Sequence, residues 1–230
     1  MAEIAIVSLR ALRVLRGEFP SMSQRFEHHA RTVTVLTFFS RITGLARDAA
    51  LSRVFGVSAI TDAFWFAFLI PNLFRRLFGE GALSASFLPV YSQLDRDDPA
   101  MARRLATVTI ALMVMALGGV TLAIELVLYL ISLTVDGETG HAGGLALRLM
   151  MVMLPYMPLV CIVAIMGAML QVHGRFGPTA SAPVVLNLFI VAASIGFVAA
   201  DQMTHVAIVS GAVLLAGAVQ VVWSIIALRR

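Results

Sequence analysis

The chain has 230 residues, of which 60% are hydrophobic and 13% are charged, and its mean hydropathy is +0.92. Because soluble globular proteins carry about 25% charged residues, this composition excludes a soluble domain and predicts an integral membrane protein. All 17 basic residues are arginines, which lie at segment ends or in one charged stretch, so the net charge of +4 does not indicate nucleic-acid binding. A phosphate-bearing partner is compatible with them, because guanidinium groups form bidentate pairs with phosphate.

Residues 1–31 precede the first long apolar segment and are predicted to be an amino-terminal extension. Within them, residues 4–16 are amphipathic, with arginines on one flank and large apolar side chains beside them. Two interpretations are open, an interfacial helix lying on the membrane and a dispensable extension. A signal peptide is disfavoured because the charges follow the apolar residues instead of preceding them.

Residues 32–230 contain apolar segments long enough to cross a bilayer as helices. We predict an all-α lobe of six transmembrane helices over residues 32–55, 61–78, 104–133, 147–170, 180–200 and 206–228. The predicted connections are a turn at 56–60, polar loops at 91–102 and 136–144, and a tight loop at 171–178. Thr61 or Asp62 is the predicted N-cap of the second helix.

Arginines are distributed unevenly between the two sets of connections. They occur in the amino-terminal tail, in residues 91–104, in the loop at 171–178 and at the carboxyl end, but not in the loops at 56–60, 136–144 and 201–205. Cytoplasmic loops of membrane proteins carry the excess of arginine and lysine. Both termini are therefore predicted to be cytoplasmic.

The first predicted span contains three charges, Arg41, Arg47 and Asp48. Each costs ~3 kcal/mol near a helix centre, about 9 kcal/mol in all, whereas the large apolar residues nearby recover roughly 5 kcal/mol. On a helix, Asp48 lies about 20° from Arg41 and Arg47 about 120° away, so the charges share one broad face with Gly44 between them. Adjacent residues do not face one another, so we expect their partners on other helices, in water or in a ligand.

The second predicted span carries a proline and further charges. Pro71 should kink the helix because it removes a backbone hydrogen bond. Arg76 and Glu80 are spaced to pair, which leaves Arg75 without an opposite charge within one turn and makes it a candidate for binding an anion. The predicted supporting charges are Asp48, Asp62, Arg76 and Glu80, and the predicted hinge residues are Gly44, Pro71, Gly79 and Gly81.

Other polar residues in the spans are interpreted more simply. Asn187 and Gln220 are predicted to bond between packed helices, and Glu125 is either a counter-charge for the arginines or a residue near the outer surface. The single cysteine excludes a disulfide framework, and the five histidines lack metal-ligand spacing. Because the sequence also lacks a nucleophile triad and a phosphate-binding loop, we predict no enzyme activity, cofactor or metal.

Three blocks of the sequence resemble the lipid II flippase family (MurJ/MviN type) of the multidrug/oligosaccharidyl-lipid/polysaccharide exporter superfamily. They are FFSRITGLARDAALSRVFG at 38–56, TDAFWFAFLIPNLFRRLFGEGALSASFLPVY at 61–91 and LQVHGRFGPTASAPVVLN at 170–187. The resemblance implies transport of lipid II, the undecaprenyl-pyrophosphate-linked peptidoglycan precursor, across the bacterial cytoplasmic (inner) membrane by alternating access. It thereby implies a part in cell wall biogenesis and cell shape.

The resemblance also implies which residues contact the substrate. By motif, the substrate-binding residues are Arg41 in SRxxG, Arg47 in ARD and Arg75 in PNLxRR, and the acidic motif positions are Asp48, Asp62 and Glu80. Converging arginines in a low-dielectric cavity would hold a pyrophosphate, while its lipid tail stays in the bilayer.

Family chains are longer and carry a second lobe, so we expect this lobe to need a second lobe or half-transporter as its partner. Two alternatives to lipid II transport are open. One is export of another lipid-linked oligosaccharide or of drugs, because related lobes share the fold. The other is a non-transporting membrane scaffold.

Overall fold

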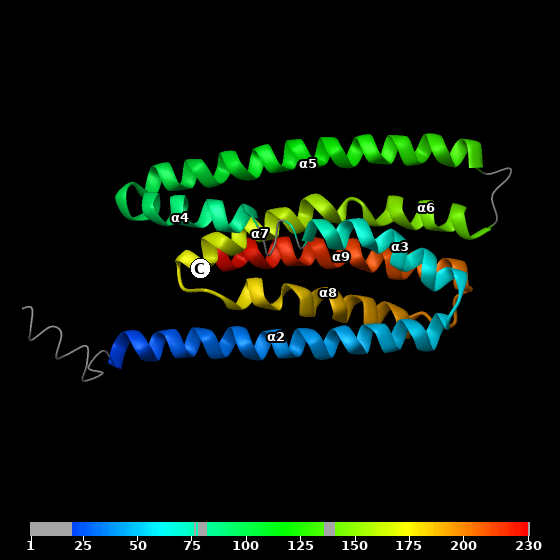
Figure 1. Cartoon of the computed structure of the whole chain (residues 1–230), viewed down its shortest axis with the longest axis horizontal. Helices are drawn as coiled ribbons and strands as arrows, with labels where there is room; N and C mark the ends of the chain where they lie inside the picture. The colour runs from blue at the N-terminus through cyan, green and yellow to red at the C-terminus, as the bar shows by residue number, and fades with distance from the viewer. Residues whose placement is uncertain (1–19, 76, 78–81, 136–140, 230) are drawn as a thin grey trace, which may run out of the picture.

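The computed structural model describes residues 20–75, 77, 82–135 and 141–229, which are helical apart from short connections (Figure 1). In chain order the helices are α2 (Pro20–Phe55), α3 (Ala59–Phe74), α4 (Ala82–Asp97), α5 (Pro99–Val135), α6 (His141–Met153), α7 (Tyr156–Val172), α8 (Gly177–Gly196) and α9 (Gln202–Arg229). Four stretches of the described residues have the length and hydropathy to cross a membrane: Pro99–Thr134, Gly143–Val172, Gly177–Gly196 and Gln202–Arg229. The predicted all-α membrane class is therefore confirmed.

The first two predicted spans are not among these four. α2 begins at Pro20 instead of near residue 32, and its charged and polar residues keep it below the hydropathy of the other long helices. α3 is apolar but has only 16 residues, since it begins at Ala59 and its α-helix ends at Phe74, three residues after Pro71. The predicted interfacial helix at 4–16 lies outside the described residues.

The turn between α2 and α3 lies where the sequence predicts it, but its capping residue is different. Ser58 caps α3, because its Oγ accepts a hydrogen bond from the N–H of Thr61 at 3.4 Å. The prediction of Thr61 or Asp62 as the cap was wrong by one turn. Asp62 instead occupies the first turn of α3, where a carboxylate interacts favourably with the helix dipole.

The predicted loop at 91–102 is also wrong, because α4 continues to Asp97 and α5 begins at Pro99. Asp98 makes this sharp corner possible. Its Oδ1 accepts hydrogen bonds from the N–H groups of Ala100 and Met101 at 3.0 and 3.1 Å, and proline suits the first position of a helix. The polar residues before the corner form the exposed side of an amphipathic α4, whose buried side carries Phe87 and Tyr91.

The α2–α3, α4–α5, α7–α8 and α8–α9 connections fall at the two ends of the bundle (Figure 1). One end holds the start of α2, the α4–α5 corner, the α7–α8 loop and the carboxyl end, and the other holds the α2–α3 and α8–α9 turns. At the first end His173 Nε2 lies 3.6 Å from Asp95 Oδ2, and Arg175 donates a hydrogen bond to the Ala227 carbonyl. The arginine-bearing connections therefore share one end of the molecule, as their distribution in the sequence predicts.

The core is centred on α7, which is apolar around most of its circumference and packs against α4, α5, α8 and α9. Pro155 separates α6 from α7 within a single candidate span, so the chain tolerates the proline by interrupting the helix. Met153, Tyr156 and Met157 are completely buried beside this break. The outer face of α5 is apolar and exposed, as expected of a lipid-facing surface, through Leu112, Met115, Leu122, Leu126, Leu130 and Leu133.

Two glycines allow helices to approach α7 closely. A Cβ on Gly217 of α9 would lie 2.6 Å from Cδ2 of the Tyr156 ring, and a Cβ on Gly167 of α7 would lie 2.7 Å from Thr179 Oγ1 of α8. A Cβ atom essentially never lies within 3.0 Å of a non-bonded heavy atom, so a side chain at either position would force a neighbour to move. The positions of the Tyr156 ring and the Thr179 side chain therefore depend on the absence of a side chain at these glycines.

We expect Gly217→Ala to lower the melting temperature of the purified chain in detergent micelles. Alanine gains about 1 kcal/mol of helix propensity over glycine, but forcing the buried Tyr156 ring aside costs about 1–3 kcal/mol. Gly211→Ala is the matched control in the same helix, because its Cβ would meet nothing within 4 Å. Equal melting temperatures for the two variants would contradict this account of the α7–α9 contact.

Candidate functional site

Arg47 is held between three helices by four side chains. From α2 its Nη1 donates to Asn187 Oδ1 of α8 at 3.1 Å, and its Nη2 lies 2.9 Å from Asp48 Oδ1. Its guanidinium carbon lies 5.1 Å from the ring centroid of Trp65 and 5.9 Å from that of Phe68, both on α3. The side chain is only 18% exposed, so these contacts fix its position and direction.

The pairing of Arg47 with Asp48 differs from our expectation that adjacent charges would not meet. The arginine side chain is long enough to fold back, so that its Nε also donates to Asp48 Oδ1 at 2.9 Å. Asp48 is half exposed, with 50% of its side-chain surface accessible. The carboxylate therefore orients the guanidinium from one side and leaves the opposite side to Asn187.

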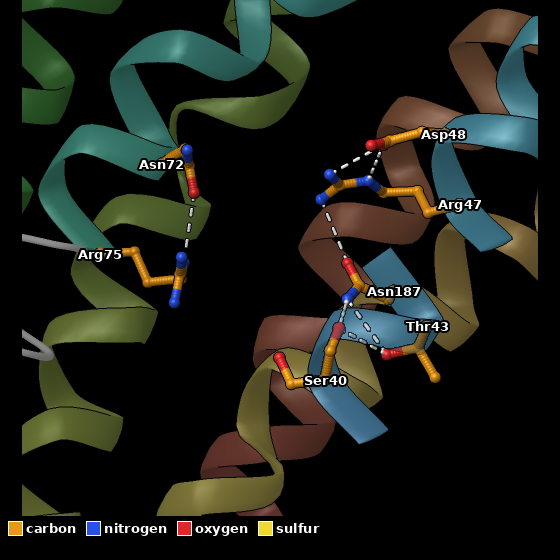
Figure 2. Close-up of polar contacts among 7 residues, drawn as sticks. All are labelled: Ser40, Thr43, Arg47, Asp48, Asn72, Arg75 and Asn187. Carbon is orange, nitrogen blue, oxygen red and sulfur yellow. Dashed lines mark hydrogen bonds and ion pairs between the residues drawn. The ribbon is translucent and has the colours of Figure 1, made fainter. Parts of the chain in front are cut away.

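Asn187 joins α8 to α2, which confirms its predicted role between packed helices. Its Nδ2 donates to the Ser40 carbonyl at 3.3 Å and to Thr43 Oγ1 at 3.2 Å, while its Oδ1 accepts from Arg47 (Figure 2). A Cβ on Gly44 would stand 3.7 Å from Asn187 Nδ2, an ordinary contact, so the space beside Gly44 is taken by Asn187. Gln220 plays a similar role between α9 and α8, where its Nε2 donates to the Ala182 carbonyl at 2.9 Å.

Arg75 directly follows α3, and its side chain lies across from that of Arg47 (Figure 2). Its Nε donates to Asn72 Oδ1 at 3.2 Å. Figure 2 shows Arg75 and Arg47 extending from different helices toward the space between them. Arg75 also lines a cavity of about 440 Å³ that includes residues of α2, α7, α8 and α9.

The other predicted site residues are more dispersed. Arg41 is exposed on α2 and does not line the cavity. Within the described ranges Glu125 forms no ion pair with an arginine, and its Oε1 has no hydrogen-bond partner. The predicted pair and hinge formed by Arg76, Gly79, Glu80 and Gly81 lie outside the described residues.

Sequence reasoning did not identify the aromatic support of Arg47 or the polar groups of the cavity. Trp65 and Phe68 are spaced i,i+3 on α3, a weak signal that they share a face. Tyr156, Thr179 and Gln220 come from three separate helices, and no local pattern brings them together. They become neighbours only through helix packing.

Comparison with protein families matches residues 51–230 to the family described as "Lipid II flippase MurJ". Lipid II flippase MurJ of Burkholderia cenocepacia is 34% identical over 195 residues, which cover 82% of this chain and 37% of that protein. Probable lipid II flippase MurJ of Bdellovibrio bacteriovorus is 41% identical over 158 residues, which cover 66% of this chain and 30% of that protein. The chain therefore spans about a third of the length of these relatives.

Among solved structures, the chain is similar to "Lipid II flippase MurJ, inward closed conformation". The TM-score is 0.64 at 25% identity, and the match covers 84% of this chain and 41% of the other. The helical bundle thus corresponds to part of that structure.

We expect Asn187→Ala to destabilise the α2–α8 contact by about 1–3 kcal/mol, because it removes hydrogen bonds from a side chain that is only 5% exposed. Thermal unfolding in detergent micelles measures the change. Leu188→Ala is the control, since the neighbouring Leu188 is 52% exposed. If both variants unfold at the same temperature, Asn187 does not hold α2 in place.

Proposed function

Because the chain belongs to the lipid II flippase MurJ family, we propose that it forms the amino-terminal lobe of a transporter that moves lipid II across the membrane for peptidoglycan synthesis. The family consists of membrane transporters rather than enzymes, and the chain is a multi-pass protein of the bacterial cytoplasmic membrane. The proposed substrate is the undecaprenyl-pyrophosphate-linked precursor, and the proposed mechanism is alternating access together with a second lobe.

The observation that carries this proposal is the fixed position of Arg47. Its guanidinium lies over the Trp65 ring, is oriented by Asp48 and Asn187, and extends toward the same space as Arg75. An arginine that is already ordered loses little side-chain entropy when it binds, and guanidinium groups match the oxygens of a pyrophosphate. We propose Arg47 and Arg75 as direct contacts of the pyrophosphate, with Arg41 joining them at the exposed side of α2.

We further propose that α2 and α3 are the first two of six membrane spans and that both termini are cytoplasmic. Both helices lie alongside the four candidate spans, α2 against α8 and α3 against α6 (Figure 1). Such packing supplies polar partners to charges that lipid would exclude. The gathering of arginines at one end of the bundle supports the orientation.

The test is complementation of a strain depleted of its own lipid II flippase. This chain would replace the matching segment of the Burkholderia cenocepacia relative, which supplies the rest of the transporter. We expect Arg47→Ala or Arg75→Ala in this chimera to abolish growth at normal membrane levels, because each removes a phosphate contact. Arg53→Ala, at an exposed position near the end of α2, should grow normally.

Two results would contradict the proposal. Full complementation by the Arg47→Ala and Arg75→Ala chimeras would remove the proposed role of the arginines. A chimera that inserts into the membrane but never supports growth would show that this lobe is not competent for lipid II transport.

A further inference from the structure

Glu125 is a carboxyl group inside a membrane span, away from the charges described above. It lies on α5 within the candidate span Pro99–Thr134, toward the end of the bundle that holds the α2–α3 and α8–α9 turns (Figure 1). The residues that follow it, LVLYLISL at 126–133, continue the apolar sequence for about 12 Å of helix. Tyr129, one turn further on, is exposed and of the residue type that marks a membrane interface. Glu125 therefore lies in the apolar part of the span, within reach of one membrane surface.

The inner face of this half of α5 is apolar. Leu117 and Leu128 belong to the main core cluster, which Leu149 of α6 also joins. Glu125 is partly buried at the edge of this face, and its Oε1 is inaccessible and has no hydrogen-bond partner. Thr121 lies one turn earlier on the same face, is 6% exposed, and its Oγ1 likewise has no partner. One carboxyl and one hydroxyl thus stand together in apolar surroundings.

The described residues supply no counter-charge to this carboxyl group. α5 packs against α4, α6 and α7, whose described charged and titratable side chains are Tyr91, Asp95, Arg96, Asp97, Arg148, Tyr156 and Cys161. Those of α4 lie at the opposite end of α5, where Tyr91 packs with Ala102. Tyr156 and Cys161 of α7 are uncharged groups buried in the core. Arg148 of α6 is exposed and forms no ion pair with Glu125.

An isolated carboxylate in such surroundings is strongly disfavoured, because it has lost its water without gaining a cation. The Thr121 hydroxyl can share a hydrogen bond with the carboxyl group in either form, but it carries no charge to neutralise it. Hard metal ions require several oxygen ligands, and the described residues contain no cluster of three acidic, histidine or cysteine side chains. A proton neutralises the group and requires no further ligand.

We propose that Glu125 is a proton-binding site within the membrane, with the Thr121 hydroxyl as the hydrogen-bond partner of its neutral carboxyl group. Because the site lies about one helical turn from Tyr129, its proton exchanges with water at that end of the bundle. The site shares no residue with the proposed translocation path, so it would exist whichever substrate the chain moves.

The experiment is covalent labelling of the full chain, purified in an uncharged detergent, with dicyclohexylcarbodiimide. This apolar reagent takes the proton of a neutral carboxyl group on one nitrogen, and the carboxylate oxygen then bonds to its central carbon. The O-acylisourea formed rearranges to a stable N-acylurea, which mass spectrometry of peptides locates. Labelling is followed between about pH 5.5 and about pH 9, where ordinary exposed carboxyl groups are ionised. A water-soluble carbodiimide is the reference reagent.

Asp201 is the matched control carboxyl group, since it lies in the α8–α9 turn at the same end of the bundle. Its Oδ2 accepts a hydrogen bond from the N–H of Thr204 at 3.0 Å, which holds the pKa of the Asp201 carboxyl below its usual value. At neutral pH we expect the apolar reagent to label Glu125 at least about tenfold faster than Asp201, and the rate to fall as the pH rises. Glu125→Gln copies the shape of the neutral carboxyl group, so it should abolish the adduct and preserve the melting temperature.

Three results would overturn the proposal. If the apolar reagent labels Glu125 no faster than Asp201, or if the water-soluble reagent labels it equally fast, the carboxyl group is ionised or lies in water. If Glu125 resists labelling in the unchanged chain but reacts in Arg148→Gln, it is the ionised partner of that arginine. If sodium chloride protects Glu125 and choline chloride at the same concentration does not, the site binds a metal cation instead of a proton.

Discussion

The contact between Asn187 and α2 is the interaction on which the polar part of this structure depends. One amide group bonds to a backbone carbonyl, a threonine hydroxyl and the guanidinium of Arg47. α2 is too polar to be held by an apolar environment alone, and α8 provides the partners that its charged face requires. An asparagine can do this because its amide both donates and accepts hydrogen bonds, so one side chain satisfies groups of both kinds.

In the apolar half of the bundle, close packing between helices takes the place of hydrogen bonding. α7 is surrounded by other helices, and glycines at 167 and 217 let α8 and α9 approach it. In a membrane, helices gain little from burying apolar surface because lipid is equally apolar, so close contacts between small residues matter more. This packing also carries the polar side chains of Tyr156, Thr179 and Gln220 into the interior, where they line one cavity.

Capping and side-chain reach account for the places where the sequence misled us. The polar run before Pro99 resembles a loop by composition, yet the carboxylate of Asp98 satisfies two N–H groups at the start of α5 and permits an abrupt helix–helix corner. Arg47 and Asp48 are adjacent, so their side chains leave the helix in different directions. The arginine side chain is nevertheless flexible enough to fold back and bond to its neighbour. Periodicity describes where a side chain leaves the backbone and not where its polar end lies.

The sequence by itself determined the membrane class, the four long apolar spans, the gathering of arginines at one end and the family resemblance, because these depend on composition, segment length and contiguous motifs. It also identified Arg47 and Arg75 as unusual charges. Only the tertiary structure decided that Trp65, Asn187 and Asp48 hold Arg47, and that Tyr156, Thr179 and Gln220 line a single cavity with Arg75. Those groups lie on helices far apart in the chain, and their meeting depends on how the helices pack, which no local pattern encodes.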